Sequence, residues 1–126
     1  MAEKPAHGTF CWNELVTTDL AAAKSFYSEL IGWEIKDSGM PGFEYYMLMA
    51  GEKHAAGLMA MPAEAKGVPS HWMGYIAVDD VDSLVEKTKA LGGSIIHGPQ
   101  DIPEVGRFLI IKDPTGAVVS LMKMVG

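Results

Sequence analysis

The chain has 126 residues, 48% of them hydrophobic, a length and composition that favour one folded domain over a disordered segment. Its net charge of −6 and the lack of any run of Lys and Arg argue against nucleic acid and membranes as partners, since both select basic patches. The single Cys11 rules out an internal disulfide, and no stretch of about 20 residues is apolar enough to span a bilayer.

A first helix is expected from Leu20 to about Leu30, where apolar residues recur at helical spacing. Thr18 or Asp19 can accept hydrogen bonds from its first free N–H groups. Gly32 follows the last apolar residue and can adopt the left-handed conformation that ends a helix.

A second helix is expected because a shift of 61 residues partly matches the chain with itself. Under this shift Asp19 falls on Asp80 and Leu30 falls on Leu91. Asp79 or Asp80 is expected to cap the second helix, with a buried face running from Val81 to Leu91. Two weak local patterns that recur in register indicate an internal repeat.

Strands are expected before and after each helix. The apolar segments that follow the helices are residues 33–36, 43–49 and 55–61 in the first half and 94–97, 107–112 and 117–123 in the second. The sequence DPTG at 113–116 predicts a type I turn between the last two strands. The coarse order is βαβββ twice, which predicts an α+β fold. Module one covers about residues 8–62 and module two about 71–124. They form a single domain over 1–126, joined by a linker at about 62–70 that is rich in Pro and Gly.

Alternation along the first strand of each module predicts two faces. Trp12, Glu14 and Val16 share one face, whereas Leu15 turns toward the helix. The residues expected on the equivalent face of the second module are Met73, Tyr75 and Ala77, with Ile76 and Val78 turned toward the helix.

This plan resembles the vicinal oxygen chelate superfamily, which includes glyoxalase I, bleomycin-resistance proteins and extradiol dioxygenases. The stretches that carry the resemblance are "FCWNELVTTDLAAAKSFYSELIGWEI", "YIAVDDVDSLVEKTKALGG" and "GRFLIIKDPTGAVVSLMK". "WNELVTTDLAAAKSFY" is most similar to the single-domain branch known as predicted enzymes related to lactoylglutathione lyase. The resemblance implies that the two modules form an open eight-stranded barrel, or cup, that binds ligands, and that the protein is a homodimer.

Metal-using members of that superfamily draw four ligands from strand positions, typically His or Gln, Glu, His and Glu. Alignment on the repeat places these positions at Trp12, Gly57, Met73 and Ser120. Indole, hydrogen, thioether and hydroxyl groups do not make a hard N/O site for a divalent ion. The sequence therefore predicts no metal ligands and no cofactor. The alternative is a divalent ion such as Zn, Ni, Fe or Mn, with His71 and Glu14 as displaced ligands.

Several side chains are candidates for binding or chemistry. Glu14 on an inward face either forms an ion pair with Arg107 or His71, or binds a polar substrate group and acts as a base. His71 is a candidate acid, or a histidine hydrogen-bonded at a strand end. The expected substrate-binding residues are Trp12, Glu14, Met73, Tyr75, Arg107 and Ser120. The expectation from packing alone is that Trp12 and Tyr75 fill the core and that Arg107 is a surface cation.

The favoured function is metal-independent binding of a small apolar or aromatic organic molecule in the cup, with or without its conversion. Any catalysis would be of a lyase or isomerase type related to glyoxalase, with Glu14 as the base. The alternatives are a divalent-metal-dependent glyoxalase I-like lyase and a protein that sequesters a drug or toxin without catalysis. A cytoplasmic location is expected, because a lone cysteine suits a reducing compartment and the N-terminus lacks an apolar leader.

Overall fold

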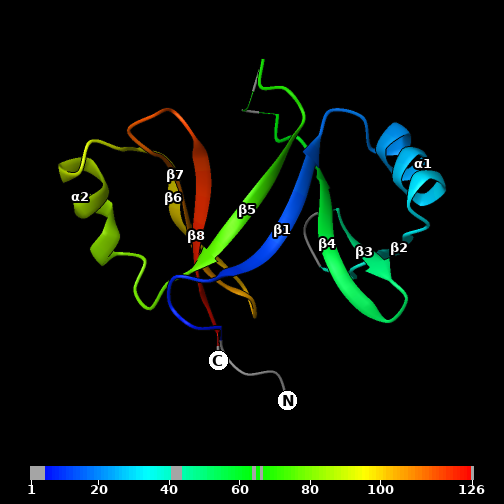
Figure 1. Cartoon of the computed structure of the whole chain (residues 1–126), viewed down its shortest axis with the longest axis horizontal. Helices are drawn as coiled ribbons and strands as arrows, with labels where there is room; N and C mark the ends of the chain where they lie inside the picture. The colour runs from blue at the N-terminus through cyan, green and yellow to red at the C-terminus, as the bar shows by residue number, and fades with distance from the viewer. Residues whose placement is uncertain (1–4, 41–43, 64, 66, 126) are drawn as a thin grey trace. The chain divides into compact units, whose positions relative to one another are not determined.

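The computed structural model describes residues 5–40, 44–63, 65 and 67–125. Within these residues the chain forms eight strands and two helices, in the order βαβββ–βαβββ (Figure 1). The first module contains β1 (Phe10–Thr17), α1 (Leu20–Leu30), β2 (Glu34–Asp37), β3 (Tyr45–Ala50) and β4 (Lys53–Ala60). The second module contains β5 (His71–Ala77), α2 (Ser83–Ala90), β6 (Ser94–Ile102), β7 (Gly106–Lys112) and β8 (Val118–Met124). The predicted α+β class and the paired modules are confirmed.

The chain divides into two compact units whose boundaries differ slightly from those of the modules. The N-terminal unit is Asn13–Met73, and the C-terminal unit combines Met1–Trp12 with Gly74–Gly126. The start of the chain belongs to the C-terminal unit because Gly8 donates to the carbonyl of Ala77 at 2.7 Å and Ala77 donates to the carbonyl of Thr9 at 2.7 Å.

The N-terminal unit has the strand order β2-β3-β4-β1, with β1 parallel to β4 and the other pairs antiparallel. Its core lies between the sheet and α1. The buried residues of that core are Leu15, Leu48, Ala56 and Leu58, and Leu20, Ala23 and Tyr27 of α1 pack against them. Helix α1 has the predicted bounds. The Asp19 side chain accepts from the N–H of Ala22 at 3.0 Å, and Gly32 follows the helix with φ +88°.

The C-terminal unit repeats this arrangement with the order β5-β8-β7-β6, in which β5 is parallel to β8. Val78, Val81, Leu109 and Leu121 form its buried core, and Leu84 and Val85 of α2 pack against them. The predicted turn at 113–116 joins β7 to β8, with the N–H of Gly116 donating to the carbonyl of Asp113 at 3.0 Å. Neither unit's sheet is closed, since β2 and β6 are edge strands.

Helix α2 departs from its predicted start. It begins at Ser83 rather than near Val81, and Val81 is buried in the turn that precedes the helix. The side chain of Asp80 accepts from the N–H of Ser83 at 3.3 Å. The residue at the cap position is Asp82, whose side chain makes no capping hydrogen bond and accepts from Arg107 instead. Leu91, expected in the buried face, is 68% exposed.

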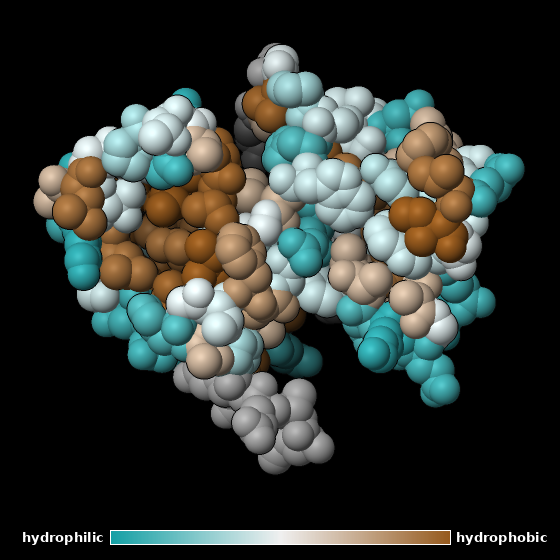
Figure 2. All heavy atoms as spheres, in the orientation of Figure 1, coloured by the Kyte–Doolittle hydropathy of each residue, from teal (hydrophilic) through white to brown (hydrophobic). Residues whose placement is uncertain are grey.

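No helix in the described part of the chain is long and apolar enough to cross a membrane. Apolar side chains are nevertheless exposed. Figure 2 shows them gathered over α1, where Phe26, Leu30 and Ile31 are more than half exposed, and between α2 and the strands of its own unit.

Candidate functional site

The N-terminal unit has a sheet face that α1 does not cover, and Glu14 lies on it. Strand pairing places Glu14 of β1 directly opposite Gly57 of β4, and Gly57 opposite Met47 of β3. Partners directly opposite each other in a sheet project to the same side. The neighbouring row on this helix-free face consists of Val16, Met59 and Tyr45. The face is therefore mostly apolar around one carboxylate.

Tyr45 occupies the space that a side chain at position 57 would take. A Cβ atom added to Gly57 would lie 1.7 Å from the Tyr45 hydroxyl oxygen and 2.4 Å from its Cζ atom. Tyr45 pairs with Met59, so its ring reaches diagonally across β4 to lie over Gly57. Because Gly57 has no side chain, the Tyr45 phenol can lie over the strand position directly opposite Glu14.

Glu14 is 6% exposed, which is rare for a carboxylate. Its side chain has an interaction partner, and every buried side-chain nitrogen and oxygen atom in the described residues makes a hydrogen bond. A buried, satisfied carboxylate next to Val16 and opposite a glycine can accept a hydrogen bond or a proton from a bound molecule. This is chemistry that an entirely apolar face could not supply.

The C-terminal unit has an equivalent row that contains Tyr75 and Ser120. Tyr75 of β5 lies opposite Ser120 of β8, which lies opposite Ile110 of β7. Ser120 is fully buried, and its Oγ donates to the carbonyl of Leu109 at 3.4 Å. Tyr75 is buried and also has a partner. Because the Ser120 hydroxyl donates to a backbone carbonyl, its chemistry here is hydrogen bonding.

The other candidates on the first strands are Trp12, Met73 and His71. Trp12 is half-buried with a partner, and Met73 is buried. The Nδ1 atom of His71 lies 2.9 Å from the carbonyl oxygen of Pro69, so Nδ1 carries the proton and donates it. His71 is therefore hydrogen-bonded at a strand end, as one of the two sequence-based expectations has it.

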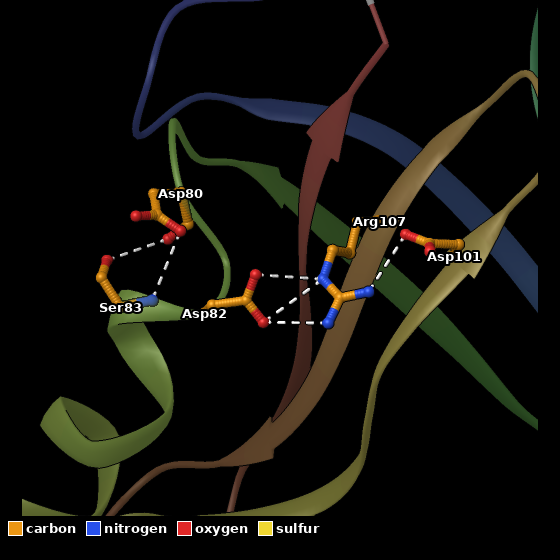
Figure 3. Close-up of polar contacts among 5 residues, drawn as sticks. All are labelled: Asp80, Asp82, Ser83, Asp101 and Arg107. Atoms are coloured by element: carbon orange, nitrogen blue, oxygen red, sulfur yellow. Dashed lines mark hydrogen bonds and ion pairs between the residues drawn. The ribbon is translucent and has the colours of Figure 1, made fainter.

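Arg107 is held by two carboxylates (Figure 3). Its Nη2 atom lies 2.9 Å from Asp82 and its Nη1 atom 3.1 Å from Asp101, and its Nε atom also donates to Asp82. The hydrogen bonds to Asp82 and then to Asp101 raise the pKa of Arg107 above its ordinary value. Strand alternation puts Arg107 on the face of β7 that carries Leu109, toward α2, and not on the face of Ile110. The structure does not bring Arg107 together with Tyr75 and Ser120, and it pairs Arg107 with aspartates rather than with Glu14.

The strand register bears on whether these residues could hold a divalent metal. The sequence alignment assigns the family's ligand positions to Trp12, Gly57, Met73 and Ser120, and in the sheet Gly57 lies opposite Glu14 and Ser120 opposite Tyr75. Indole, hydrogen, thioether and hydroxyl groups offer no strong ligand for a hard cation, so Glu14 beside them would be the one carboxylate in these rows. In the described residues no three His, Cys, Asp or Glu side chains gather where they could hold a metal ion. The residues at these positions do not fit a four-ligand metal site.

Sequence reasoning missed Tyr45. Its signal was present as a glycine in the interior of an apolar strand, since an empty position in a packed sheet must be filled by a neighbour. Which neighbour fills it depends on the pairing of β3 with β4, and the sequence alone does not give that pairing.

Comparison with known proteins shows which family the sequence of this chain matches. The sequence model described as the Glyoxalase/Bleomycin resistance protein/Dioxygenase superfamily matches residues 9–121. A relative named "Putative glyoxylase CFP32" from Mycobacterium tuberculosis is 43% identical over 92% of this chain and 44% of its own length. The "Anthracycline biosynthesis protein DnrV" of Streptomyces peucetius is 28% identical over 94% of this chain and 48% of its own length. The chain thus spans about half the length of these curated relatives.

Solved structures share the fold at low sequence identity. The methylmalonyl-CoA epimerase of Mycobacterium tuberculosis matches with a TM-score of 0.62 and 16% identity over 94% of this chain and 89% of its own. A methylmalonyl-CoA epimerase in complex with methylmalonyl-CoA matches with a TM-score of 0.60 and 17% identity, over 96% of this chain and 97% of its own.

Proposed function

Because the chain belongs to the glyoxalase/bleomycin resistance protein/dioxygenase superfamily, we propose that it binds a small apolar or aromatic organic molecule without a metal ion. The ligand lies against the helix-free face of the N-terminal unit, where Glu14 is its polar anchor. The observation that carries this proposal is the placement of buried Glu14 opposite Gly57, with the Tyr45 phenol filling the space where a side chain of residue 57 would lie.

The chemistry of this face supports an apolar ligand with one polar group. Met47 lies in the row of Glu14, and Val16 and Met59 lie in the next row; methionine side chains adapt to ligands of different shapes. A flat carbonyl or hydroxyl compound can lie on such a surface and direct its oxygen toward the carboxylate and the phenol. An anthracycline is a suitable probe of this class, because one relative is named for anthracycline biosynthesis.

If the bound molecule is converted, Glu14 is the base. It would take a proton from a carbon next to a carbonyl group and return it elsewhere, as an isomerase or lyase does. His71 and Met73, which belong to the same unit, are proposed as further contacts to this ligand. Trp12, Tyr75 and Ser120 belong to the C-terminal unit and are proposed as ligand-binding residues of that unit. Arg107 is not proposed as a ligand contact, because its Nε and Nη2 atoms donate to Asp82 and its Nη1 atom donates to Asp101.

The proposal is tested with daunorubicin as the binding probe and with the hemithioacetal of methylglyoxal and glutathione as a glyoxalase substrate. Daunorubicin binding is measured by fluorescence quenching and turnover of the hemithioacetal by absorbance, both in the presence of EDTA. We expect daunorubicin binding that EDTA leaves unchanged. Glu14→Gln is expected to abolish any turnover while changing the dissociation constant by less than about threefold. Glu34→Gln, an exposed glutamate on β2, is the matched control.

The outcomes separate the three functions. Glu14-dependent turnover in EDTA supports a metal-free enzyme, and tight binding without turnover supports a sequestering protein. Turnover that appears only after a divalent metal is added would refute metal independence and favour a glyoxalase I-like lyase.

We also propose that the protein is a homodimer, because Phe26, Leu30 and Ile31 expose apolar surface on α1 (Figure 2). Light scattering after size exclusion is expected to give twice the chain mass of 13.6 kDa. A monomer mass at micromolar concentration would contradict this.

A further inference from the structure

We propose that His97 and Gln100, brought together by a bulge in β6, form a binding site for aromatic ligands that carry a phenolic hydroxyl. The ring nitrogen Nδ1 of His97 accepts the hydrogen bond that the ligand hydroxyl donates. The site lies within the C-terminal unit, so this inference holds or fails independently of the proposed ligand face around Glu14.

The bulge turns two polar side chains to one face of the sheet. His97 pairs with Ile110 of β7 and Gln100 pairs with Phe108, and the register shifts between these two pairs. Residues three apart in a regular strand project to opposite faces. The extra residue in β6 instead places both side chains on the face of Ile110 and Phe108. This is the face that α2 does not cover, because Leu109, between them on β7, packs on the α2 side.

Gly98 makes this bulge possible. Its φ is +97°, and a Cβ atom there would lie 2.8 Å from the carbonyl oxygen of Phe108 and 3.3 Å from the backbone nitrogen of Gln100. Only glycine satisfies both constraints. Bulges are frequent at sheet edges and beside active sites, where they redirect a side chain. Strand β6 is an edge strand, and the side chains redirected here include a histidine.

Two contacts hold the His97 ring and leave one nitrogen for a ligand. The ring stacks on Phe108, with 5.7 Å between the ring centres and 27° between the planes. Its Nε2 atom is hydrogen-bonded to the Oε1 atom of Gln100. An amide oxygen only accepts, so Nε2 carries the proton and Nδ1 of the neutral ring presents a lone pair. In the part of the chain that the structure describes, Nδ1 makes no hydrogen bond, and His97 is exposed.

The surroundings of this nitrogen select the class of ligand. Phe108 and Ile110 are half-buried and offer apolar surface beside the imidazole, on which an aromatic ring can lie. A phenolic hydroxyl on that ring can donate to Nδ1, whereas an ether oxygen or a carboxylate, which only accepts, cannot. Because His97 and Gln100 are exposed, such a ligand reaches Nδ1 from solvent.

The test compares 2-naphthol with 2-methoxynaphthalene, which has the same rings and no hydroxyl proton. Binding is followed by NMR through the backbone amide of Phe108, so that a probe bound elsewhere on the chain does not count. We expect 2-naphthol to bind about three- to tenfold more tightly, the usual effect of one hydrogen bond. His97→Phe keeps a ring beside Phe108 but has no nitrogen, and it is expected to bind both probes equally. His54→Phe, at an exposed histidine of β4, is the matched control and is expected to keep the preference.

The tautomer of His97 gives a second readout, which a change of surface shape alone would not move. A long-range proton–nitrogen spectrum at about pH 8, where ordinary histidines are neutral, is expected to show the proton of His97 on Nε2. The Nδ1 resonance is expected to shift with 2-naphthol and not with 2-methoxynaphthalene. Gln100→Leu removes the acceptor that fixes the tautomer, so we expect a mixture of tautomers and a smaller preference for 2-naphthol.

Three results would overturn the inference. Equal affinities of the wild type for the two probes, or a preference that His97→Phe retains, would show that Nδ1 does not bind the hydroxyl. An amide resonance of Phe108 that neither probe shifts at millimolar concentration would show that no site exists there. Each of these results leaves the proposal for Glu14 standing, because that proposal is tested with other probes and another variant.

Discussion

The pairing of Gly57 with Tyr45 makes a quantitative prediction about stability. Gly57→Ala adds one methyl group at a point 1.7 Å from the Tyr45 hydroxyl oxygen and 2.9 Å from its Cε1 atom. Non-bonded heavy atoms normally lie about 3.5–4.0 Å apart, so the end of the ring must move by about 2 Å. Overpacking of this kind costs about 1–3 kcal/mol.

The same substitution should have the opposite sign once Tyr45 is shortened. In a Tyr45→Ala background the clash is gone, and replacing a strand glycine by alanine gains up to about 0.5–1 kcal/mol. The coupling energy between the two positions is therefore expected to be about 2 kcal/mol or more. At this chain length it corresponds to a difference in melting temperature of roughly 6 °C or more.

The assay is urea unfolding of the wild type, the two single variants and the double variant, followed by circular dichroism. Tyr45→Phe combined with Gly57→Ala is a useful fifth protein, because the ring atoms nearest the new methyl are still present and most of the cost should remain. If Gly57→Ala changes the free energy of unfolding equally in the wild-type and Tyr45→Ala backgrounds, the phenol does not occupy the place of residue 57.

Two further predictions concern the C-terminal unit. Leu109 is fully buried, so Leu109→Ala should destabilise the protein by about 2–5 kcal/mol, whereas Leu91→Ala, at a site 68% exposed, should cost less than about 1 kcal/mol; chemical denaturation checks both, and equal costs would contradict the core assignment. Hydrogen bonds from the Thr115 side chain and from the backbone N–H groups of Ala117 and Thr115 lower the pKa of Asp113. The turn's contribution to stability is therefore present above the ordinary aspartate pKa and lost as the pH falls toward the lowered value. An NMR titration should show Asp113 titrating below ordinary aspartates, and Asp113→Asn should make stability less dependent on pH in that acidic range; a normal Asp113 pKa would refute this.

Much of the fold follows from local sequence signals. The bounds of α1 could be predicted because Asp19 and Gly32 act within a few residues of the helix ends. The start of α2 was predicted in part: Asp80, one of the two expected caps, accepts from the N–H of Ser83, but residues 81 and 82 form a turn before the helix. The ion pair of Asp82 with Arg107, 25 residues further along the chain, is beyond what local propensity can show.

The candidate site was also predictable only in part, because strand alternation is a local signal and strand pairing is not. Strand alternation was enough to separate Glu14 from Leu15, and the structure confirms Leu15 in the core beside α1. Alternation does not fix which residues of two strands lie opposite each other. The repeat alignment matched Trp12 with Met73 and Gly57 with Ser120 between the modules, but it gave no pairing across a sheet, and only the structure shows Gly57 opposite Glu14 and Ser120 opposite Tyr75. The position of Tyr45 over Gly57 likewise depends on strand register, and the ion pairs of Arg107 depend on aspartates distant in the sequence.

The central claim is that this protein binds its ligand through its own side chains and needs no metal ion. Elemental analysis is the most direct test of this claim. The protein is expressed in medium containing Zn, Ni, Fe and Mn, purified without chelator, and measured by inductively coupled plasma mass spectrometry beside its daunorubicin affinity before and after EDTA. The expected result is less than about 0.1 divalent ion per chain and an unchanged affinity, because Trp12, Gly57, Met73 and Ser120, the residues aligned with the family's ligand positions, offer no strong ligand for a hard cation. About one ion per chain, removed by EDTA together with binding or turnover, would contradict the account.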